Sequence, residues 1–265
     1  MQHPPVSRPS IVGGNHIPAD ETGRATLLKM AGLVKRLPYW LQPAYIDEAR
    51  FIVQSREFDK LVRGYCLAGS CLNAGCGEML YFDWLNAHTE LTRVVHVDLH
   101  TQAETAVRAN RRHQACPGSL TDLPFSDAEF DFCLCTEVLE HIKDDDRAVS
   151  EIARCLKPGG LLLASTPTPP APFDPNHVRE GYQLGELRHL FLKHELVIER
   201  YGYTFHILFR FLYNLWRFLL LTLGRGKISF MPRFMLRGIA FLDLWFSAGK
   251  PWDIYVLARK RHKPS

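Results

Sequence analysis

Two short segments of this chain have the residue types and spacing to hold a nucleoside together. The first, Cys71–Gly77, is an apolar run that ends in Gly75-Cys76-Gly77, and the second, Val94–Asp98, is an apolar run that ends in a carboxylate. Glycines let a backbone turn approach a ligand closely, and a carboxylate at the end of the next strand accepts hydrogen bonds from ribose hydroxyls. The pair predicts an adenosine site, which dinucleotide enzymes and S-adenosylmethionine enzymes share.

Two histidines could move a proton. His141 ends the segment Leu139-Glu140-His141, and His177 lies in the polar stretch Asn176–Arg179. Imidazole titrates near neutral pH, so either ring could act as a general base towards an acceptor. The alternative is that these histidines only cap or pack. Glu140 is a weaker candidate for the same role, and its own alternative is a structural role. We predict His141 and His177 as the catalytic residues.

An alternation of strands and helices is expected to position these residues. Apolar runs of strand length alternate with amphipathic segments from residue 70 onward. This pattern predicts an α/β, Rossmann-like fold with a mostly parallel sheet and helices on both faces. The expected strands are 70–74, 93–98, near 117–120, 130–135, 160–165, 195–204 and 252–260, and the expected helices are 78–88, 101–113, 144–156 and 184–193.

The chain is expected to contain three regions. Residues 1–66 combine a Pro- and Gly-rich tail with a helical cap, including a helix over 46–62. Residues 67–206 and 250–262 are expected to form the core. Residues 207–249 are expected to form a hydrophobic, basic helical insertion before the last strand.

The segment that follows the adenosine motif narrows the choice of ligand. It contains Leu123-Pro124-Phe125, Phe130-Asp131, Leu139-Glu140-His141 and Leu156-Lys157-Pro158-Gly159-Gly160 in that order. This series closely resembles the class I S-adenosylmethionine-dependent methyltransferases, in particular the ubiquinone/menaquinone biosynthesis group within methyltransferase type 11. The resemblance covers roughly residues 68–202. It implies a seven-stranded sheet and S-adenosyl-L-methionine as the cofactor.

The resemblance also implies roles for individual residues. The glycine turn would lie beneath the cofactor and its methionine end, and Asp98 would hold the ribose. The adenine would lie against the turn after the third strand, the backbone that ends the fourth strand would meet the cofactor's amino group, and His141 would lie at the mouth of the site. The cofactor-binding residues implied in this way are Asn73, Gly75, Cys76, Gly77, Asp98, Leu99, Ser119, Leu120, Cys135 and Thr136.

Three positions depart from the family pattern. Asn73 stands where relatives usually have an acid, Met79 replaces the third glycine of the turn, and Ser119 replaces the acid that reads the adenine amino group. Loss of one charge-assisted hydrogen bond costs roughly 1–3 kcal/mol, so cofactor affinity is expected to be lower without being abolished. These departures keep a non-catalytic relative of the family as an alternative.

Charge is concentrated in the insertion. Of the net charge of +4, residues 207–250 carry seven basic side chains and one acidic, while the rest of the chain is slightly negative. The run Phe205–Leu223 is nearly long enough to span a bilayer, but four polar residues interrupt it on one helical face: His206, Arg210, Asn214 and Arg217. The expected role is contact with a membrane surface or a lipid-like substrate. A lid, a homodimer face and a spanning helix remain alternatives, and nucleic acid is not expected.

Cysteine usage indicates a reducing compartment. The seven cysteines follow no secreted spacing pattern, and no secretory signal begins the chain, so the expected location is cytoplasmic or peripheral to a membrane. A zinc site through Cys133 and Cys135 is conceivable, but their spacing does not match the usual ligand spacings of zinc sites. We therefore expect no metal.

The sequence predicts an S-adenosylmethionine-dependent methyltransferase that acts on an oxygen or carbon atom of a small apolar or lipid-like acceptor. The alternative is a non-catalytic scaffold of the same fold that binds a membrane or protein partner through residues 207–249. A nicotinamide dehydrogenase is disfavoured, because the segment from Leu123 to Gly160 is not expected in that class and no third glycine follows the turn.

Overall fold

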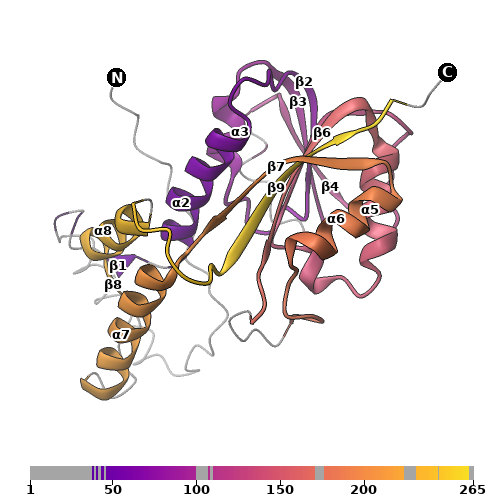
Figure 1. The fold of residues 1–265 in the computed structure, drawn as a ribbon. Helices are drawn as coiled ribbons and strands as arrows, with labels where there is room; N and C mark the ends of the chain where they lie inside the picture. Colours follow the sequence, from indigo (N-terminus) through magenta and orange to yellow (C-terminus); the bar gives the residue numbers. More distant parts are fainter. Residues whose placement is uncertain are drawn as a thin grey trace, which may run out of the picture.

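A seven-stranded sheet forms the centre of the protein in a computed structural model (Figure 1). The structure describes residues 38, 40, 43–44, 46–99, 107, 110–170, 176–223, 231–243 and 245–262. The strand order is β4-β3-β2-β5-β6-β9-β7. The strands are β2 (Gly69–Ala74), β3 (Leu91–Asp98), β4 (His113–Pro117), β5 (Phe130–Thr136), β6 (Leu156–Pro167), β7 (Leu196–Thr204) and β9 (Asp253–Lys260).

The sheet is mostly parallel, as predicted. β4, β3, β2, β5 and β6 run in parallel, and only β9 runs antiparallel to its neighbours β6 and β7. In chain order, β2 is the first strand of this sheet, β3 and β4 follow on one side of it, and β5 lies on its other side. The strand order therefore reverses between β2 and β5, and in such sheets ligands bind outside the carboxyl ends of the strands at that point.

Helices cover both faces of the sheet (Figure 1). α2 (Ile46–Leu61) and α3 (Phe82–Ala87) bury Phe58 and Trp84 against one face, while α5 (Asp145–Cys155) and α6 (Leu184–Lys193) bury Ile152 and Phe191 against the other. Burial of each large apolar side chain contributes roughly 1.5–3 kcal/mol. The Asp144 carboxylate accepts a hydrogen bond from the Arg147 backbone nitrogen and caps the start of α5.

Two predicted boundaries are wrong. The strand expected near 117–120 lies at His113–Pro117, because His113 is buried and its polarity hides the strand from a hydrophobicity pattern. The helix expected at 78–88 begins only at Phe82, since Gly77 and Met79 have positive φ and keep the chain out of a helical conformation. The expected helix at 101–113 lies largely outside the described residues, and its end is replaced by the start of β4.

The predicted insertion between β7 and β9 contains α7 (Ile207–Leu223), the short strand β8 (Met231–Pro232) and α8 (Arg233–Asp243). It packs on the start of α2 through a separate apolar cluster, and β8 pairs with β1 (Pro43–Ala44). The N-terminal helical segment and the insertion therefore share one small core. The members of that cluster are Ala49, Val53, Phe205, Phe209, Met231, Leu236, Ile239 and Ala240.

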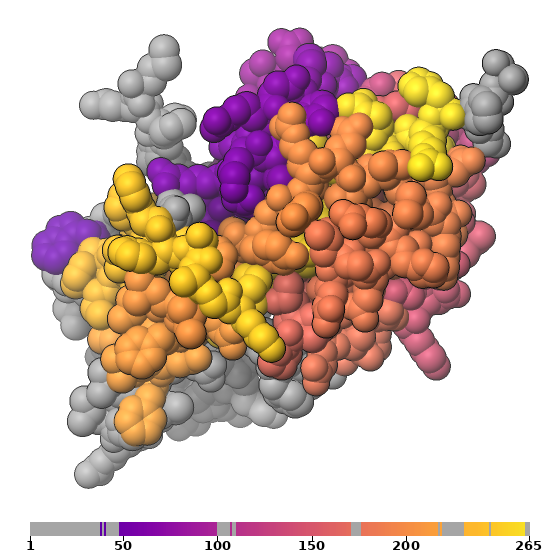
Figure 2. Space-filling model, in the orientation of Figure 1, coloured from indigo at the N-terminus to yellow at the C-terminus, as the bar shows by residue number. Residues whose placement is uncertain are grey.

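The insertion lies to one side of the sheet (Figure 1), and its described residues form an orange and yellow projection at one end of the surface in Figure 2. Within the described part of the chain, no helix combines the length and the apolar character that a membrane crossing requires. The residues before Pro38, which include the predicted tail, lie outside the described part.

Candidate active site at the carboxyl edge of the sheet

The glycine turn and Asp98 meet at the carboxyl edge of the sheet, where β2 and β3 end. The backbone nitrogens of Gly75 and Cys76 donate hydrogen bonds to the Val97 carbonyl at 2.8 and 3.0 Å. The backbone nitrogen of Gly77 donates to the Asp98 carboxylate at 2.9 Å. Because parallel strands end at the same edge, two motifs separated along the chain become one structural unit.

The two glycines of this turn have different surroundings. Both have positive φ, 72° at Gly75 and 47° at Gly77. A Cβ atom on Gly75 would lie 2.3 Å from Cγ2 of Val138, whereas a Cβ atom on Gly77 would meet no described atom within 4 Å. Gly75 therefore permits close packing beneath the segment after β5, and the space over Gly77 is open to a ligand. Met79 is buried against Cys76 and leaves this space free.

Asn73 lies beneath the turn, and its side chain binds a buried pair of histidines. Its Nδ2 atom lies 3.0 Å from Nδ1 of His96, and Nε2 of His96 lies 2.8 Å from Nδ1 of His113. The Asn73 amide nitrogen can only donate, so His96 accepts at Nδ1 and donates to His113 from Nε2. Burial, aided by the neighbouring His113, lowers the pKa of His96 to about 3. Burial and Arg112 lower the pKa of His113 to about 4, so both rings are neutral at pH 7.

The predicted adenine side of the site lies in the turn after β4. The Gly118 backbone nitrogen donates to the Asp98 carbonyl at 3.0 Å, which ties this turn to the end of β3. The Ser119 hydroxyl lies 2.8 Å from the Thr121 hydroxyl and accepts a hydrogen bond from the Thr121 backbone nitrogen at 3.2 Å. Leu120 is buried in the main core, whereas Leu99 is exposed. Ser119 and Leu99 are thus the accessible members on this side.

The end of β5 is buried and leads into a strained residue. Cys135 and Thr136 are buried, and burial raises the pKa of the Cys135 thiol, which keeps it neutral. Glu137 has a positive φ of 53°, and its backbone nitrogen donates to the Ser165 carbonyl at 2.9 Å. The Ser165 hydroxyl donates to the Glu137 carboxylate at 2.8 Å. These two contacts with β6 hold the turn that follows β5. A non-glycine residue such as Glu137 keeps a positive φ only when its surroundings support it.

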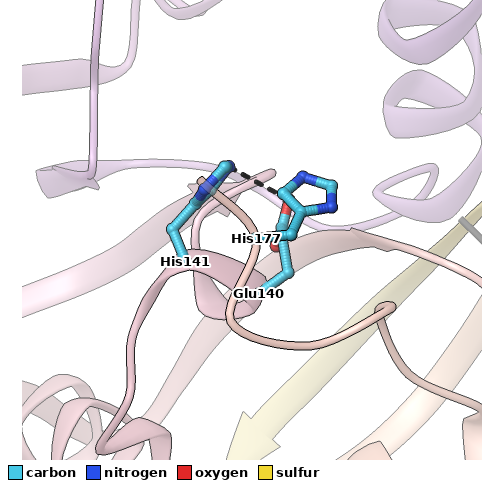
Figure 3. A group of neighbouring side chains, drawn as sticks. All are labelled: Glu140, His141 and His177. Carbon is cyan, nitrogen blue, oxygen red and sulfur yellow. Dashed lines mark ion pairs between the residues drawn. The ribbon is translucent and has the colours of Figure 1, made fainter. Parts of the chain in front are cut away.

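Three side chains with metal-binding and proton-accepting atoms converge beyond this turn (Figure 3). Glu140 and His141 belong to the 3-10 helix η2 (Leu139–His141), and His177 comes from the loop after β6. Nε2 of His141 lies 3.9 Å from Oε1 of Glu140, and the His141 and His177 rings lie 4.6 Å apart between centroids. The structure therefore brings the two predicted catalytic histidines together at the carboxyl edge of the sheet.

Backbone contacts hold this cluster in place. Nδ1 of His141 donates to the Asn176 carbonyl at 3.2 Å, and the Val178 backbone nitrogen donates to the Glu140 carbonyl at 3.0 Å. Because Nδ1 of His141 is the donor, Nε2 of the neutral ring carries the free lone pair. The Arg179 guanidinium also donates to the Ile142 carbonyl at 3.1 Å, which fixes the loop that carries His177.

Sequence reasoning missed a group of buried polar residues beside the histidines. The Gln54 amide and the Tyr255 hydroxyl donate to the Asp253 carboxylate at 3.1 and 3.2 Å. Burial and then the neighbouring Glu137 carboxylate raise the pKa of both Asp253 and Glu140 well above the usual range of a carboxyl group. No sequence spacing could reveal this group, since its members come from α2, from the segment after β5 and from the start of β9.

A cavity lies at the opposite edge of the sheet. This cavity of about 560 Å³ is lined by residues 64–68 before β2 and by the start of β6, together with Arg259 and His262. These residues surround the amino ends of the strands. Ligands of open parallel sheets bind at the carboxyl ends, so the glycine turn and the histidine cluster define the candidate site.

Comparison with known proteins identifies the kind of domain that this segment resembles. Residues 72–164 match the methyltransferase domain family model, a segment that runs from the middle of β2 into β6. Over 123 residues the chain is 35% identical to a probable S-adenosylmethionine-dependent methyltransferase of Mycobacterium tuberculosis, covering 43% of this chain and 44% of that protein. Over 145 residues it is 34% identical to a ubiquinone biosynthesis O-methyltransferase of Nitrobacter winogradskyi, covering 52% of each protein.

The chain thus spans about half the length of these curated relatives. Among solved structures, the [4+2]-cyclase SpnF superposes with a TM-score of 0.55 at 19% identity, covering 78% of this chain and 80% of that one. This likeness shows the fold, and the fold alone does not decide the reaction. Residues 72–164 thus match a methyltransferase domain, and the relatives that this part of the chain resembles are methyltransferases, one of them named as S-adenosylmethionine-dependent.

Proposed function

We propose that this chain, whose residues 72–164 match a methyltransferase domain, transfers the methyl group of S-adenosylmethionine to an oxygen or carbon atom of a small apolar or lipid-like acceptor. The observation that carries the proposal is the hydrogen bond of 2.9 Å between the Gly77 backbone and the Asp98 carboxylate. It places the open glycine turn and the predicted ribose carboxylate together, on the same edge of the sheet as His141 and His177.

The residues present fit the cofactor at this edge. The space over Gly77 is free of described atoms within 4 Å of a Cβ position, which suits close approach of the sulfonium nucleoside to the backbone. The Asp98 carboxylate would accept hydrogen bonds from the ribose hydroxyls, with the exposed Leu99 beside it. Ser119 and Leu120 would flank the adenine, and the backbone of Cys135 and Thr136 would meet the amino group.

Asn73 takes a supporting position in this proposal. Its amide nitrogen is directed to His96, so the carboxamide fixes the end of β2 beneath the turn. Cys76 is buried in the turn, and burial raises the pKa of its thiol to about 12, so the group stays neutral beside the cofactor. The turn therefore contributes backbone shape, and Asp98 contributes the charge.

S-adenosylmethionine supplies a methyl group that is already activated on a sulfonium. The transfer is one displacement: the acceptor oxygen forms a bond to the methyl carbon as the sulfur–methyl bond breaks, and that electron pair remains on the sulfur. A hydroxyl acceptor must also lose its proton. Nε2 of His141 carries the free lone pair that accepts it, and the edge-on contact with His177 holds the ring towards the acceptor.

The preference for an apolar acceptor rests on the surface of the insertion. Ile207, Phe211, Phe241 and Trp245 on or beside α7 and α8 are exposed, although their neighbours on the same helices pack into the core. An apolar surface of this kind commonly marks a binding region for lipid or membrane. The insertion lies at the same edge as the histidines, since the Thr168 backbone nitrogen at the end of β6 donates to the Trp252 carbonyl at 2.6 Å.

The structure gives the basic residues of the insertion a structural role. Arg233 and Arg237 both form ion pairs with Glu48 of α2, at 2.7 and 3.1 Å, and Arg210 donates to the Lys250 carbonyl at 2.9 Å. These arginines stabilise the insertion, so the aromatic side chains carry the proposed contact with lipid. We place the protein in the cytoplasm, in reversible contact with a membrane surface through residues 207–249.

The test combines binding with labelled transfer. Calorimetry with S-adenosylhomocysteine is expected to give one binding site per chain. A cell extract incubated with the protein and isotopically labelled S-adenosylmethionine is expected to yield a labelled product in the organic phase, identified by mass spectrometry. If the nucleoside does not bind at millimolar concentration, the proposed function is wrong. Label confined to water-soluble products would reject the apolar acceptor.

A further inference from the structure

We propose that Glu140, His141 and His177 bind a divalent transition-metal ion of the Zn²⁺ class. Their ligand atoms, one carboxylate oxygen and one nitrogen from each imidazole, all lie within 4.8 Å of one another. Two histidines and one carboxylate are a donor set that holds such an ion while leaving a coordination position open. Figure 3 shows the three side chains side by side, with a dashed line for the ion pair between His141 and Glu140.

The strongest observation is the state of the Glu140 side chain. It is fully buried, with 0% exposure, and neither carboxylate oxygen has a hydrogen-bond partner in the described structure. A buried polar group without a partner costs free energy, so such a group requires an explanation. Nε2 of His141 lies 3.9 Å from Oε1 of Glu140, which is beyond hydrogen-bond distance. An ion between these atoms would satisfy the carboxylate.

The ring of His141 is oriented as a metal ligand. Its Nδ1 atom donates to the Asn176 carbonyl at 3.2 Å, which leaves the Nε2 lone pair directed towards Glu140. Metal-binding histidines usually donate their other nitrogen to a carbonyl or carboxylate in this way, since that contact fixes the tautomer and the ring. The same carbonyl directly precedes His177 in the chain, so this contact also connects the His141 ring to the segment that carries His177.

The cluster needs only a small contraction to close on an ion. At bond lengths of about 2.0–2.1 Å, the ligands of a tetrahedral ion lie about 3.4 Å apart. The loop backbone is held by the hydrogen bond of 3.0 Å from Val178 to the Glu140 carbonyl, while the His177 side chain is only partly buried. Rotation of the His177 imidazole can therefore bring its donor atom closer without movement of η2, while the Asn176 contact keeps the His141 ring in place.

A role in the reaction follows, and this part rests on the proposed function. A Zn²⁺-class ion at the open position would attract an acceptor hydroxyl and favour loss of its proton to water. His141 and His177 would then hold the ion, in place of accepting the proton themselves. The site would select acceptors with a hydroxyl group, and oxygen would be the methylated atom.

The experiment uses the full chain, freed of metal with a chelator and without a polyhistidine tag. Calorimetry with ZnCl₂ is expected to give one site, and Co²⁺ is expected to give visible absorption bands. His177→Ala and the isosteric Glu140→Gln are each expected to weaken this site by about 100-fold or more, because loss of a ligand exceeds the 10- to 100-fold effect of outer contacts. His189→Ala, an exposed histidine on α6, is the matched control and should leave binding unchanged.

Two outcomes overturn the metal site. One is the absence of Zn²⁺ binding to the chelator-treated protein, and the other is Zn²⁺ binding that persists in both cluster variants, which would assign it to other histidines or cysteines. S-adenosylhomocysteine binding is measured on the same samples. Nucleoside binding without Zn²⁺ binding would reject this inference and leave the proposed function intact, whereas Zn²⁺ binding without nucleoside binding would reject the proposed function alone.

Discussion

The backbone nitrogen of Gly77 donates a hydrogen bond of 2.9 Å to the Asp98 carboxylate. This contact connects the turn after β2 with the last residue of β3, although Leu91 begins β3 well after that turn in the chain. It orients the carboxylate over the edge of the sheet where a nucleoside would bind. An ionised carboxylate has about four acceptor positions, so Asp98 has the chemistry to accept from ribose hydroxyls as well as from Gly77.

Replacement of Asp98 by Asn is expected to weaken S-adenosylhomocysteine binding about 10- to 100-fold. A hydrogen bond to a charged group contributes about 1.5–3 kcal/mol, and 1.4 kcal/mol corresponds to a tenfold change in affinity. The amide oxygen of the variant can still accept from Gly77, so the fold should persist. Calorimetry measures the affinity, and circular dichroism checks the fold.

The matched control for Asp98 is Glu90→Gln. Glu90 is exposed and directly precedes the first residue of the same strand. Its replacement by Gln therefore removes the same charge as Asp98→Asn, but at the opposite edge of the sheet. Its affinity should equal that of the unmodified protein. Equal loss of affinity in both variants would mean that net charge, and not the ribose contact, causes the effect.

Alanine at Gly75 is expected to destabilise the protein far more than alanine at Gly77. Both positions have positive φ, which costs a non-glycine residue roughly 1–3 kcal/mol. Only at Gly75 would the new Cβ collide with Val138, at 2.3 Å, and overpacking adds roughly 1–3 kcal/mol. Urea unfolding should therefore show a loss of roughly 2–6 kcal/mol for Gly75→Ala and the smaller backbone cost for Gly77→Ala.

The double variant Gly75→Ala with Val138→Ala separates collision from backbone strain. Removal of the Val138 methyl groups is expected to relieve the steric part of the Gly75→Ala effect, because those methyl groups are the atoms in conflict. Additive losses in the double variant would show that Val138 does not limit the residue at position 75.

The buried histidine pair predicts that stability falls as the pH decreases. The pKa of His96 is about 3 and that of His113 about 4 in the folded protein, whereas an unfolded histidine has a pKa near 6.5. Below about pH 6.5 the unfolded chain binds protons that the folded chain excludes, so each histidine lowers the free energy of unfolding by about 1.4 kcal/mol per pH unit. The contribution is fully present above about pH 6.5 and is lost as the pH falls towards 4.

Urea unfolding between pH 7 and pH 5 tests this pH dependence. In the double variant His96→Gln with His113→Gln, the slope of the free energy of unfolding against pH should be smaller than in the unmodified protein by up to about 2.7 kcal/mol per pH unit. The exposed His189→Gln variant on α6 should keep the full slope. An unchanged slope in the double variant would show that other groups control acid sensitivity.

Acidic residues at Phe211 or Trp245 are expected to reduce binding to lipid vesicles. Both side chains are exposed, at 62% and 73%, and insertion of each aromatic group into lipid would contribute roughly 1.5–3 kcal/mol. Phe211→Asp and Trp245→Asp should each weaken sedimentation with anionic vesicles about 10- to 100-fold. Leu192→Asp on α6, where another exposed apolar residue changes, should have no effect. Equal binding by all three variants would reject the insertion as the lipid-binding surface.

Much of the fold follows from local patterns. Apolar runs with bounds close to those observed predicted β2, β3 and β5, because strands buried on both faces of a parallel sheet are almost continuously apolar. β4 was displaced by four residues in the prediction, since its first residue, His113, is buried. The partner that makes this burial tolerable is His96 on the neighbouring strand. A polarity pattern cannot register a partner that is remote in the chain.

The orientation of the insertion also depended on tertiary packing. Helical spacing predicted that His206 and Arg210 share one side of the segment, but the side that would face the interior was not determined. In the structure His206 is 7% exposed and its backbone nitrogen donates to Asp243 at 2.6 Å, while Phe211 faces outward. The choice depends on which helix lies opposite, and here α8 supplies the buried carboxylate.

The sequence by itself determined the sheet, the glycine turn, Asp98 at the end of the next strand and the methyltransferase character of residues 72–164. These features depend on neighbouring residues and on the rule that parallel strands end at one edge. The tertiary structure alone decided that Glu140 is buried without a hydrogen-bond partner in the described structure, and that His177 lies against His141. Such contacts join segments that the chain separates, and only packing of the whole sheet sets their distance.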